Sequence, residues 1–241
     1  MKKQNIHIIL GTAHLETTPG KQSPDGRLKE AVYSRERLAV IKAVLESQGY
    51  QVAYDYEPLA PKNEWATIRR KAGWKAEQAK ELSYRAQHVN SCCSQYGADN
   101  CIYVSLHVNA AGSDNKWHGA GGWCAYTSIG KTKADQLAEC FYDAAIYNLK
   151  DYISIMAAGK LKGDYTDEQT PLRMNYTDGD RDLEADFFVL NHTRCPAILT
   201  ENLFQDNLSD VNFLLSETGK HVIERLHIEG ILSYIENYML R

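Results

Sequence analysis

Two histidines and two glutamates lie where this sequence could bind a metal ion. His14, His107 and Glu201 each stand at or just beyond the end of an apolar run, and Glu30 lies at the start of the first helical pattern. Zinc binds imidazole and carboxylate groups in tetrahedral geometry, and two histidines with one carboxylate leave a position for water. A lone histidine at a strand end is more often structural, but the four residues together predict a zinc site.

Such a site would suit the hydrolysis of an amide. Zinc lowers the pKa of a bound water to roughly 7, so hydroxide becomes available at neutral pH. A second carboxylate outside the metal ligands can accept the proton of that water and pass it to the leaving amine. The sequence offers two carboxylates, Glu30 and Glu201, so one could bind the metal and the other could transfer the proton.

The elements that must position these residues follow from the apolar pattern. Short apolar runs indicate five strands, at 6–10, 51–56, 101–106, 123–127 and 196–201. Helical spacing indicates helices around 38–45, 82–93, 134–149, 211–215 and 222–238. Alternation of the two predicts an α/β fold, a twisted, mostly parallel sheet with helices on both faces. The carboxyl ends of parallel strands share one edge, where ligand sites gather.

Length and composition favour one soluble α/β domain. The chain has 241 residues, and we expect residues 1–241 to form a single catalytic domain. Its formal net charge of -4 gives no reason to expect a nucleic-acid partner or an anionic membrane. No stretch reaches the ~20 apolar residues of a membrane span. The polar, weakly patterned segment 151–186 is interpreted as a possible inserted loop or lid.

The cysteines do not indicate a metal site or a disulfide framework. None of the six forms a CxxC pair, so we expect mostly free, buried thiols. A papain-like hydrolase needs a reactive cysteine at the start of a helix, whereas Cys92 and Cys93 lie late in a predicted helix.

Four ordered blocks resemble the zinc-dependent N-acetylmuramoyl-L-alanine amidases, the family of cell-wall autolysins and phage lysins. The blocks are Gly11-Thr12-Ala13-His14, Gly26-Arg27-Leu28-Lys29-Glu30, Ser105-Leu106-His107-Val108-Asn109-Ala110 and Pro196-Ala197-Ile198-Leu199-Thr200-Glu201. The resemblance implies that His14, Glu30 and His107 bind one Zn²⁺ and that Glu201 is the catalytic carboxylate. It also implies a structural role for Arg85 and matches Asn207 to a further block. The implied substrate is peptidoglycan, cut between N-acetylmuramic acid and L-alanine.

Two of these blocks depart from the family pattern. The family usually has Asp-Pro-Gly before the first zinc histidine, where this sequence has Gly-Thr-Ala, and it usually has Gly-Phe where Asn202-Leu203-Phe204 stands. The substitution before His14 bears on how that histidine is positioned.

Further substrate contacts are weaker predictions. Asn109 could orient the substrate or hold its own loop, and Arg173 and Arg181 could pair with carboxylates of the stem peptide. Two alternative functions stay open, a zinc carboxypeptidase acting on cell-wall peptides and a non-catalytic peptidoglycan-binding domain. We expect action at the cell wall or in the periplasm. No signal peptide is visible, which fits a mature bacterial enzyme or phage-type release.

Overall fold

The protein folds around a six-stranded sheet with the strand order β2-β1-β3-β6-β4-β5. The computed structural model describes residues 2–152 and 172–240. The strands are β1 (His7–Thr12), β2 (Gln51–Tyr54), β3 (Cys101–Asn109), β4 (Cys124–Thr127), β5 (Leu183–Glu184) and β6 (Ala197–Phe204). Strands β2, β1, β3 and β6 are parallel, whereas β4 pairs with β6 antiparallel and with β5 parallel. The predicted mostly parallel α/β sheet is therefore confirmed.

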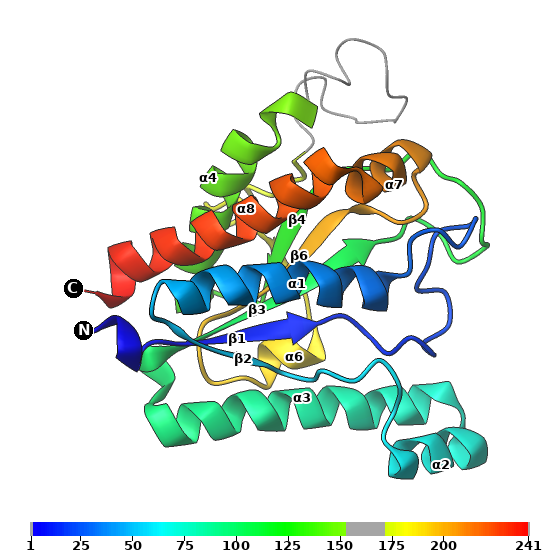
Figure 1. Cartoon of the computed structure of the whole chain (residues 1–241), viewed down its shortest axis with the longest axis horizontal. Coiled ribbons are helices and arrows are strands. Elements are labelled where there is room, and N and C mark those ends of the chain that lie inside the picture. The colour runs from blue at the N-terminus through cyan, green and yellow to red at the C-terminus, as the bar shows by residue number, and fades with distance from the viewer. Residues whose placement is uncertain (1, 153–171, 241) are drawn as a thin grey trace.

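Helices cover both faces of this sheet (Figure 1). The helices are α1 (Glu30–Ser47), α2 (Asn63–Ala72), α3 (Trp74–Tyr96), α4 (Lys133–Asn148), α6 (Phe188–Asn191), α7 (Leu208–Leu215) and α8 (Glu217–Tyr234), with a π-helical end, Ile235–Met239. Short 3-10 turns occupy Lys3–Asn5 and Ala98–Asn100. None of the described helices is long and apolar enough to cross a membrane.

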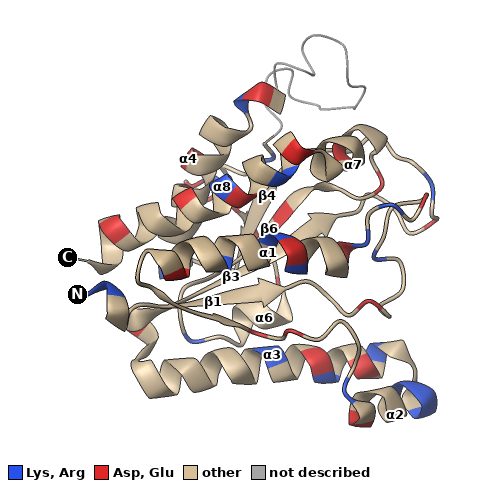
Figure 2. Cartoon of the chain, viewed as in Figure 1, with Lys and Arg blue, Asp and Glu red and all other residues tan. Residues whose placement is uncertain are grey.

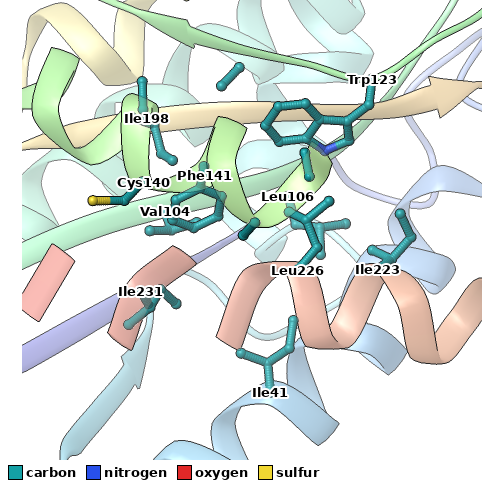
Figure 3. Packing of buried hydrophobic residues seen from close by; sticks show 14 of the residues in the cluster. Ile41, Val104, Leu106, Trp123, Cys140, Phe141, Ile198, Ile223, Leu226 and Ile231 are labelled. Atoms are coloured by element: carbon teal, nitrogen blue, oxygen red, sulfur yellow. The ribbon is translucent and has the colours of Figure 1, made fainter. Parts of the chain in front are cut away.

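Alternating side chains of the strands build two separate cores. In β3, Ile102, Val104 and Leu106 belong to the larger core under α1, α4 and α8, which also contains Phe141, Trp123 and Leu226 (Figure 3). Cys101 and Tyr103 point to the opposite face and pack with Val89 of α3 and Val189 of α6. This period of two follows from strand geometry. It also assigns Ser105, His107 and Glu201 to the face that α3 and α6 cover.

The predicted elements differ from the observed ones mainly in extent. The last predicted strand, 196–201, continues to Phe204 as β6, and the strand at 51–56 ends at Tyr54. The helices α2 and α6 and the strand β5 were not predicted. Of the suggested lid, residues 153–171 lie outside the described residues, whereas Leu172 bridges to Trp123 and Leu183–Glu184 adds the edge strand β5. A lid role for 151–186 stays a prediction.

Charged side chains lie mainly on the helices and loops, and the strands carry few of them (Figure 2). The six strands contain two such residues, Glu184 in the edge strand β5 and Glu201 in β6. A carboxylate inside a buried central strand needs compensation, because burial of an unpaired charge is costly. Glu201 therefore marks the position in the sheet where a functional group is expected.

Candidate metal centre and active site

His14 follows β1 and is held in an unusual backbone conformation. Its φ of 40° lies in the left-handed region, which is uncommon for residues other than glycine. Two arginines bind the backbone here: Arg35 donates to the carbonyl oxygens of Ala13 and His14 at 2.8 and 2.9 Å, and Arg85 donates to that of His14 at 3.4 Å. These bonds fix the loop and direct the imidazole of His14 toward the sheet edge.

A buried ionic network replaces the family's usual turn before His14. Arg85 binds Glu81 at 2.6 Å and Asp55 at 2.8 Å, and it also donates to the hydroxyl of Thr12 at 2.8 Å. Asp55 accepts the backbone N–H of Thr12 at 2.8 Å and the hydroxyl of Tyr103 at 2.9 Å. Thr12 thus ties the end of β1 to Asp55, which directly follows β2. The predicted structural role of Arg85 agrees with these contacts.

Gly11 is required by the close approach of β1 to β3. A Cβ atom at this position would lie 2.6 Å from the Ser105 Oγ and from the Tyr103 hydroxyl, and 2.7 Å from the Ser105 Cα. The last contact is with backbone, which has no flexible end to move away. The glycine of the Gly-Thr-Ala sequence therefore lets β1 lie against the strand that carries His107.

Glu30 is the first residue of α1 and has no exposed surface. Its Oε1 lies 3.0 Å from the His107 Nδ1 and 3.5 Å from the His14 Nε2, and it accepts the N–H of Val108 at 3.2 Å. Its Oε2 is buried and finds no hydrogen-bond partner within residues 2–152 and 172–240, although the Lys21 ammonium lies 3.8 Å away. A buried carboxylate oxygen of this kind has unused capacity for a ligand.

The three predicted ligands meet at one point. Potential ligand atoms of His14, Glu30 and His107 all lie within 4.8 Å of one another, and the two imidazole rings are perpendicular with centroids 5.0 Å apart. Ligand bonds of about 2.1 Å would place the corners of a tetrahedron about 3.4 Å apart. The spacings of 3.0 and 3.5 Å around Glu30 Oε1 are close to that edge. The donor set and its spacing therefore fit zinc.

His107 also has the second contact that metal-binding histidines usually make. Its Nε2 lies 3.0 Å from the hydroxyl of Ser105, two residues earlier on the same face of β3. A hydrogen bond at the far nitrogen fixes the tautomer and the ring orientation, and leaves Nδ1 to face a metal. The side-chain amide of Asn202 also donates to the His107 carbonyl at 2.9 Å, which holds β6 against β3 at this point.

The protonation states suit a metal site, which needs neutral imidazole and ionised carboxylate. Burial lowers the pKa of His14 well below its ordinary value, although the charge of Glu30 opposes the shift. Burial by itself would raise the pKa of Glu30, but the nearby His14, Lys21 and His107 outweigh it and lower that pKa. His14 is therefore neutral and Glu30 ionised at neutral pH.

Glu201 lies beside His107 in the sheet, since the two residues are direct partners in the β3–β6 register. Its Oε2 is buried and has no hydrogen-bond partner among the described residues. Burial and the charge of Glu30 raise the pKa of Glu201 well above its ordinary value. The pKa values of these two neighbouring carboxylates are thus separated. Glu30 is ionised and Glu201 is able to hold a proton, which is the usual sign of acid–base chemistry.

A cavity of about 280 Å³ opens over these residues. Its polar wall contains His14, Lys21, His107 and Glu201. Its apolar wall comes from α3, α6 and the residue before α6, and includes Leu82, Phe187 and Phe188. The site is thus a concave surface with a few convergent polar groups, which is typical of a substrate pocket.

A sequence profile of the N-acetylmuramoyl-L-alanine amidases matches residues 8–233, so it includes every element that carries the site. The chain belongs to this family. A search of curated protein sequences found no match for the amidase. The family resemblance seen in the sequence blocks is confirmed.

Solved structures share the fold of the amidase. The CwlD amidase from Clostridioides difficile, solved in complex with the GerS lipoprotein, is 20% identical with a TM-score of 0.65, covering 96% of this chain and 98% of that one. Ami1 of Mycobacterium smegmatis is 16% identical with a TM-score of 0.62 over 98% and 99% of the two chains. The catalytic domain of the CD27L endolysin is 18% identical with a TM-score of 0.57 over 95% and 97%.

The weaker sequence predictions lie apart from the four central residues. Asn109 accepts the N–H of Ala110 at 2.8 Å, as expected for a residue that holds its own loop. Arg181 forms ion pairs with Glu139 and Asp143 of α4, so its guanidinium is already paired within the amidase. Arg173 is exposed, and its guanidinium donates a long hydrogen bond of 3.4 Å to the Gly121 carbonyl and lies over the ring of Phe204. None of the three lines the cavity, and their roles in substrate binding stay predictions.

Some residues of the site gave no usable signal in the sequence. Lys21 lies in the loop between β1 and α1 with no motif around it, yet it lines the cavity and faces Glu30. Asp55 also gave no signal, because it lay inside the predicted strand at 51–56, whereas the observed β2 ends at Tyr54 and Asp55 directly follows it. Asn207, matched through the family, caps α7 by accepting the N–H groups of Ser209 and Asp210 at 2.9 and 3.2 Å.

A buried histidine supports the strand that carries Glu201 from the other face. His227 of α8 has no exposed surface; its Nε2 lies 2.9 Å from the Thr200 hydroxyl and its Nδ1 lies 2.7 Å from the Ile223 carbonyl. Burial lowers its pKa to about 4. The unfolded chain binds this proton below about pH 6.5 and the folded chain resists it, so the free energy of unfolding should fall between pH 6.5 and 4.

The expected loss from this group is about 3 kcal/mol across that interval. It can be measured by urea unfolding at a series of pH values. His227→Gln should unfold with a shallower pH dependence, whereas His192→Gln, at an exposed histidine stacked on Phe188, should match the unaltered protein. An unchanged slope in the His227 variant would show that another group controls acid stability.

Proposed function

We propose that this amidase binds one zinc ion through His14, Glu30 and His107, and that Glu201 acts as general base and then general acid. The bond cleaved is the amide between the lactyl group of N-acetylmuramic acid and L-alanine. The observation that carries the proposal is the geometry of the trio, whose ligand atoms lie within 4.8 Å of one another. Two of the three residues, His14 and His107, line a cavity that Glu201 also lines.

When bound, zinc supplies Lewis acidity, which polarises a carbonyl and lowers the pKa of water. The protein supplies the rest. Glu30 and His107 are rigidly held, the first at a helix start and the second in the central strand β3. The Arg35 and Arg85 contacts keep the His14 loop in place. This rigidity matters because small displacements of reacting groups are costly in rate.

Glu201 moves the proton in the proposed reaction. Its carboxylate accepts a proton from the attacking water and then donates that proton to the nitrogen of the departing L-alanine. Burial and Glu30 raise its pKa, so it retains a proton long enough to deliver it. Phe187, Phe188 and Leu82 form the apolar wall of the cavity in which this exchange would take place.

The products of digestion test the function directly. Zinc-loaded protein incubated with purified peptidoglycan should release stem peptides with a free L-alanine amine and leave sugar strands without peptides, as read by mass spectrometry. A zinc carboxypeptidase would instead give shortened peptides still joined to the sugar. A non-catalytic wall-binding domain would sediment with peptidoglycan and release nothing. Either of the last two results would refute the proposal.

We place this reaction at the cell wall, since the substrate is located there. The comparisons include both bacterial amidases and an endolysin, at similar identities, so they favour neither an autolysin nor a lysin. The specificity for the stem peptide would depend on groups around the cavity, among which Lys21 is the cation nearest to Glu30.

A further inference from the structure

Lys21 is a cation of the cavity wall to which the proposed reaction gives no role. Its ammonium lies 3.8 Å from the Glu30 Oε2, beyond hydrogen-bonding distance, and makes no hydrogen bond within the part of the chain that the structure describes. An ammonium carries three N–H donors. The side chain is 32% exposed, so these donors are open to a ligand that enters the cavity.

The other cation that lines the cavity is already bound. Arg85 forms ion pairs with Glu81 at 2.6 Å and Asp55 at 2.8 Å. It also donates to the Thr12 hydroxyl, and its side chain is 3% exposed. No further lysine or arginine of the described residues lines this cavity. An anionic group of a substrate would therefore meet Lys21.

The backbone at Lys21 is held by both elements that carry the carboxylates of the site. The Lys21 carbonyl accepts the N–H of Glu30, the first residue of α1, at 3.0 Å. The preceding carbonyl, of Gly20, accepts the side-chain amide of Gln205 at 2.7 Å. Gln205 directly follows β6, the strand of Glu201. With the backbone fixed in this way, only the lysine side chain has to be ordered when a ligand binds.

The composition of the cavity wall restricts where an anionic group can bind. Leu82, Phe187 and Phe188 are apolar and offer no hydrogen-bond donor from their side chains. The carboxylate of Glu201 would repel a second carboxylate when ionised. Lys21 is therefore the side chain of this wall whose charge and free donors match an incoming carboxylate.

Stem peptides carry such a carboxylate next to the bond that the amidase cuts. The residue after L-alanine is a glutamate whose side chain continues the peptide, so its α-carboxyl group is either free or converted to an amide. Its Cα lies about 3.8 Å from that of L-alanine. This separation is as short as that between Lys21 and the proposed ligand Glu30.

We propose that Lys21 binds this α-carboxylate and makes the amidase selective for the acidic stem peptide over the amidated one. The subsite rests on the proposed function, because it belongs to the same cavity. An ammonium forms charge-assisted hydrogen bonds with a carboxylate, and these are roughly twice as strong as bonds between neutral groups. A carboxamide in the same place offers one neutral oxygen and two donors that the ammonium cannot use.

The test compares two muramyl tripeptides, N-acetylmuramoyl-L-alanyl-γ-D-glutamyl-L-lysine and its α-amide, as substrates of the zinc-loaded chain. The unaltered amidase should cleave the carboxylate form with a kcat/KM about tenfold higher. Lys21→Met should abolish this preference by raising KM for the carboxylate form alone. Lys21→Arg keeps the charge and should keep the preference.

Lys116→Met is the matched control. Lys116 also lies 3.8 Å from a carboxylate, that of Asp114, but its side chain is 76% exposed and it does not line the cavity. This variant removes the same charge and should retain the preference for the carboxylate form. Loss of the preference here would show that the overall charge of the protein, rather than the Lys21 contact, selects the substrate.

Calorimetry adds a measurement that does not depend on cleavage. In zinc-loaded Glu201→Gln, the carboxylate form should bind about tenfold more tightly than the amide, and adding Lys21→Met should remove the difference. An equal loss of activity on both substrates in Lys21→Met would overturn the subsite, because Lys21 would then act on Glu30 or on the transition state. A preference that survives in Lys21→Met would place the carboxylate elsewhere.

Failure of the subsite and failure of the amidase function give different results. If the unaltered chain releases no L-alanine amine from either tripeptide, the proposed function fails. Calorimetry on the unaltered chain and on Lys21→Met then decides the subsite separately. Equal affinity of the unaltered chain for the two tripeptides would refute it, whereas a preference lost in Lys21→Met would support it.

Discussion

Replacing Glu201 with glutamine should lower kcat by about 10³-fold while leaving the fold and the zinc content unchanged. Glutamine has nearly the same shape as glutamate but cannot accept a proton from water or return one to an amine. The Oε2 of Glu201 is buried and has no hydrogen-bond partner in the part of the chain that the structure describes, so little of the fold depends on its charge. The rate is measured as release of new L-alanine amines from purified peptidoglycan.

The matched control is Glu184→Gln, which alters the other glutamate of the sheet. Glu184 is exposed in the edge strand β5 and accepts the N–H of Gly130 at 2.6 Å. This variant should retain the rate of the unaltered protein. Substrate binding by the Glu201 variant should persist, as seen by sedimentation with peptidoglycan. Full activity of Glu201→Gln would mean that another group moves the proton.

Loss of one ligand should have an effect at least as large. His107→Ala should reduce zinc from one ion per chain to a small fraction and lower activity by about three orders of magnitude or more, because the several kcal/mol supplied by the metal are lost. Zinc content is measured by elemental analysis of protein purified without chelators. Activity is measured with the same peptidoglycan assay.

His118→Ala provides the comparison for this variant. His118 lies in the exposed loop after β3 and bonds to Asp114 at 2.7 Å, outside the trio of ligands. It should bind zinc and cleave peptidoglycan normally. Cooperative thermal unfolding of both variants would show that a lost ligand, rather than a lost fold, explains the result. Stoichiometric zinc in folded His107→Ala would refute the assigned ligand set.

The central residues could be predicted because strand ends are easy to recognise in sequence. His14, His107 and Glu201 each follow or end an apolar run, and parallel strands bring such ends to one edge. Glu30 reaches the same edge because α1 begins there and runs back across the sheet (Figure 1). Topology alone thus brings the four residues together, and the roles that we propose for them come from the resemblance to the family.

The supporting residues were harder to predict because long-range contacts determine them. Arg85 could be matched to the family, but its binding of Asp55 and Thr12 depends on how α3 packs against β1 and β3. The antiparallel direction of β4 could not be predicted either, because a short apolar run does not indicate in which direction the strand pairs. Lys21 comes from a loop without periodicity, so only the folded chain brings it to Glu30.

The Gly-Thr-Ala departure before His14 has a physical explanation in this network. Thr12 provides an N–H and a hydroxyl that bind Asp55 at 2.8 and 3.1 Å, and Ala13 donates its N–H to Ser34 at 3.0 Å. The loop is therefore held by side chains of α1 and by the residue after β2. A rigid Asp-Pro turn is not needed to position the histidine.

The conformation of Leu203 explains the other departure from the family blocks. It stands next to Phe204, where the family has glycine, and its φ of 63° lies in the left-handed region that glycine favours. The pairing of β3 and β6 changes register here, between His107 and Asn109. The backbone keeps this geometry with a fully buried leucine in place, at the expense of local strain. A search pattern that demands glycine two residues after the position of Glu201 would therefore miss this member of the family, whereas one built on backbone shape would retain it.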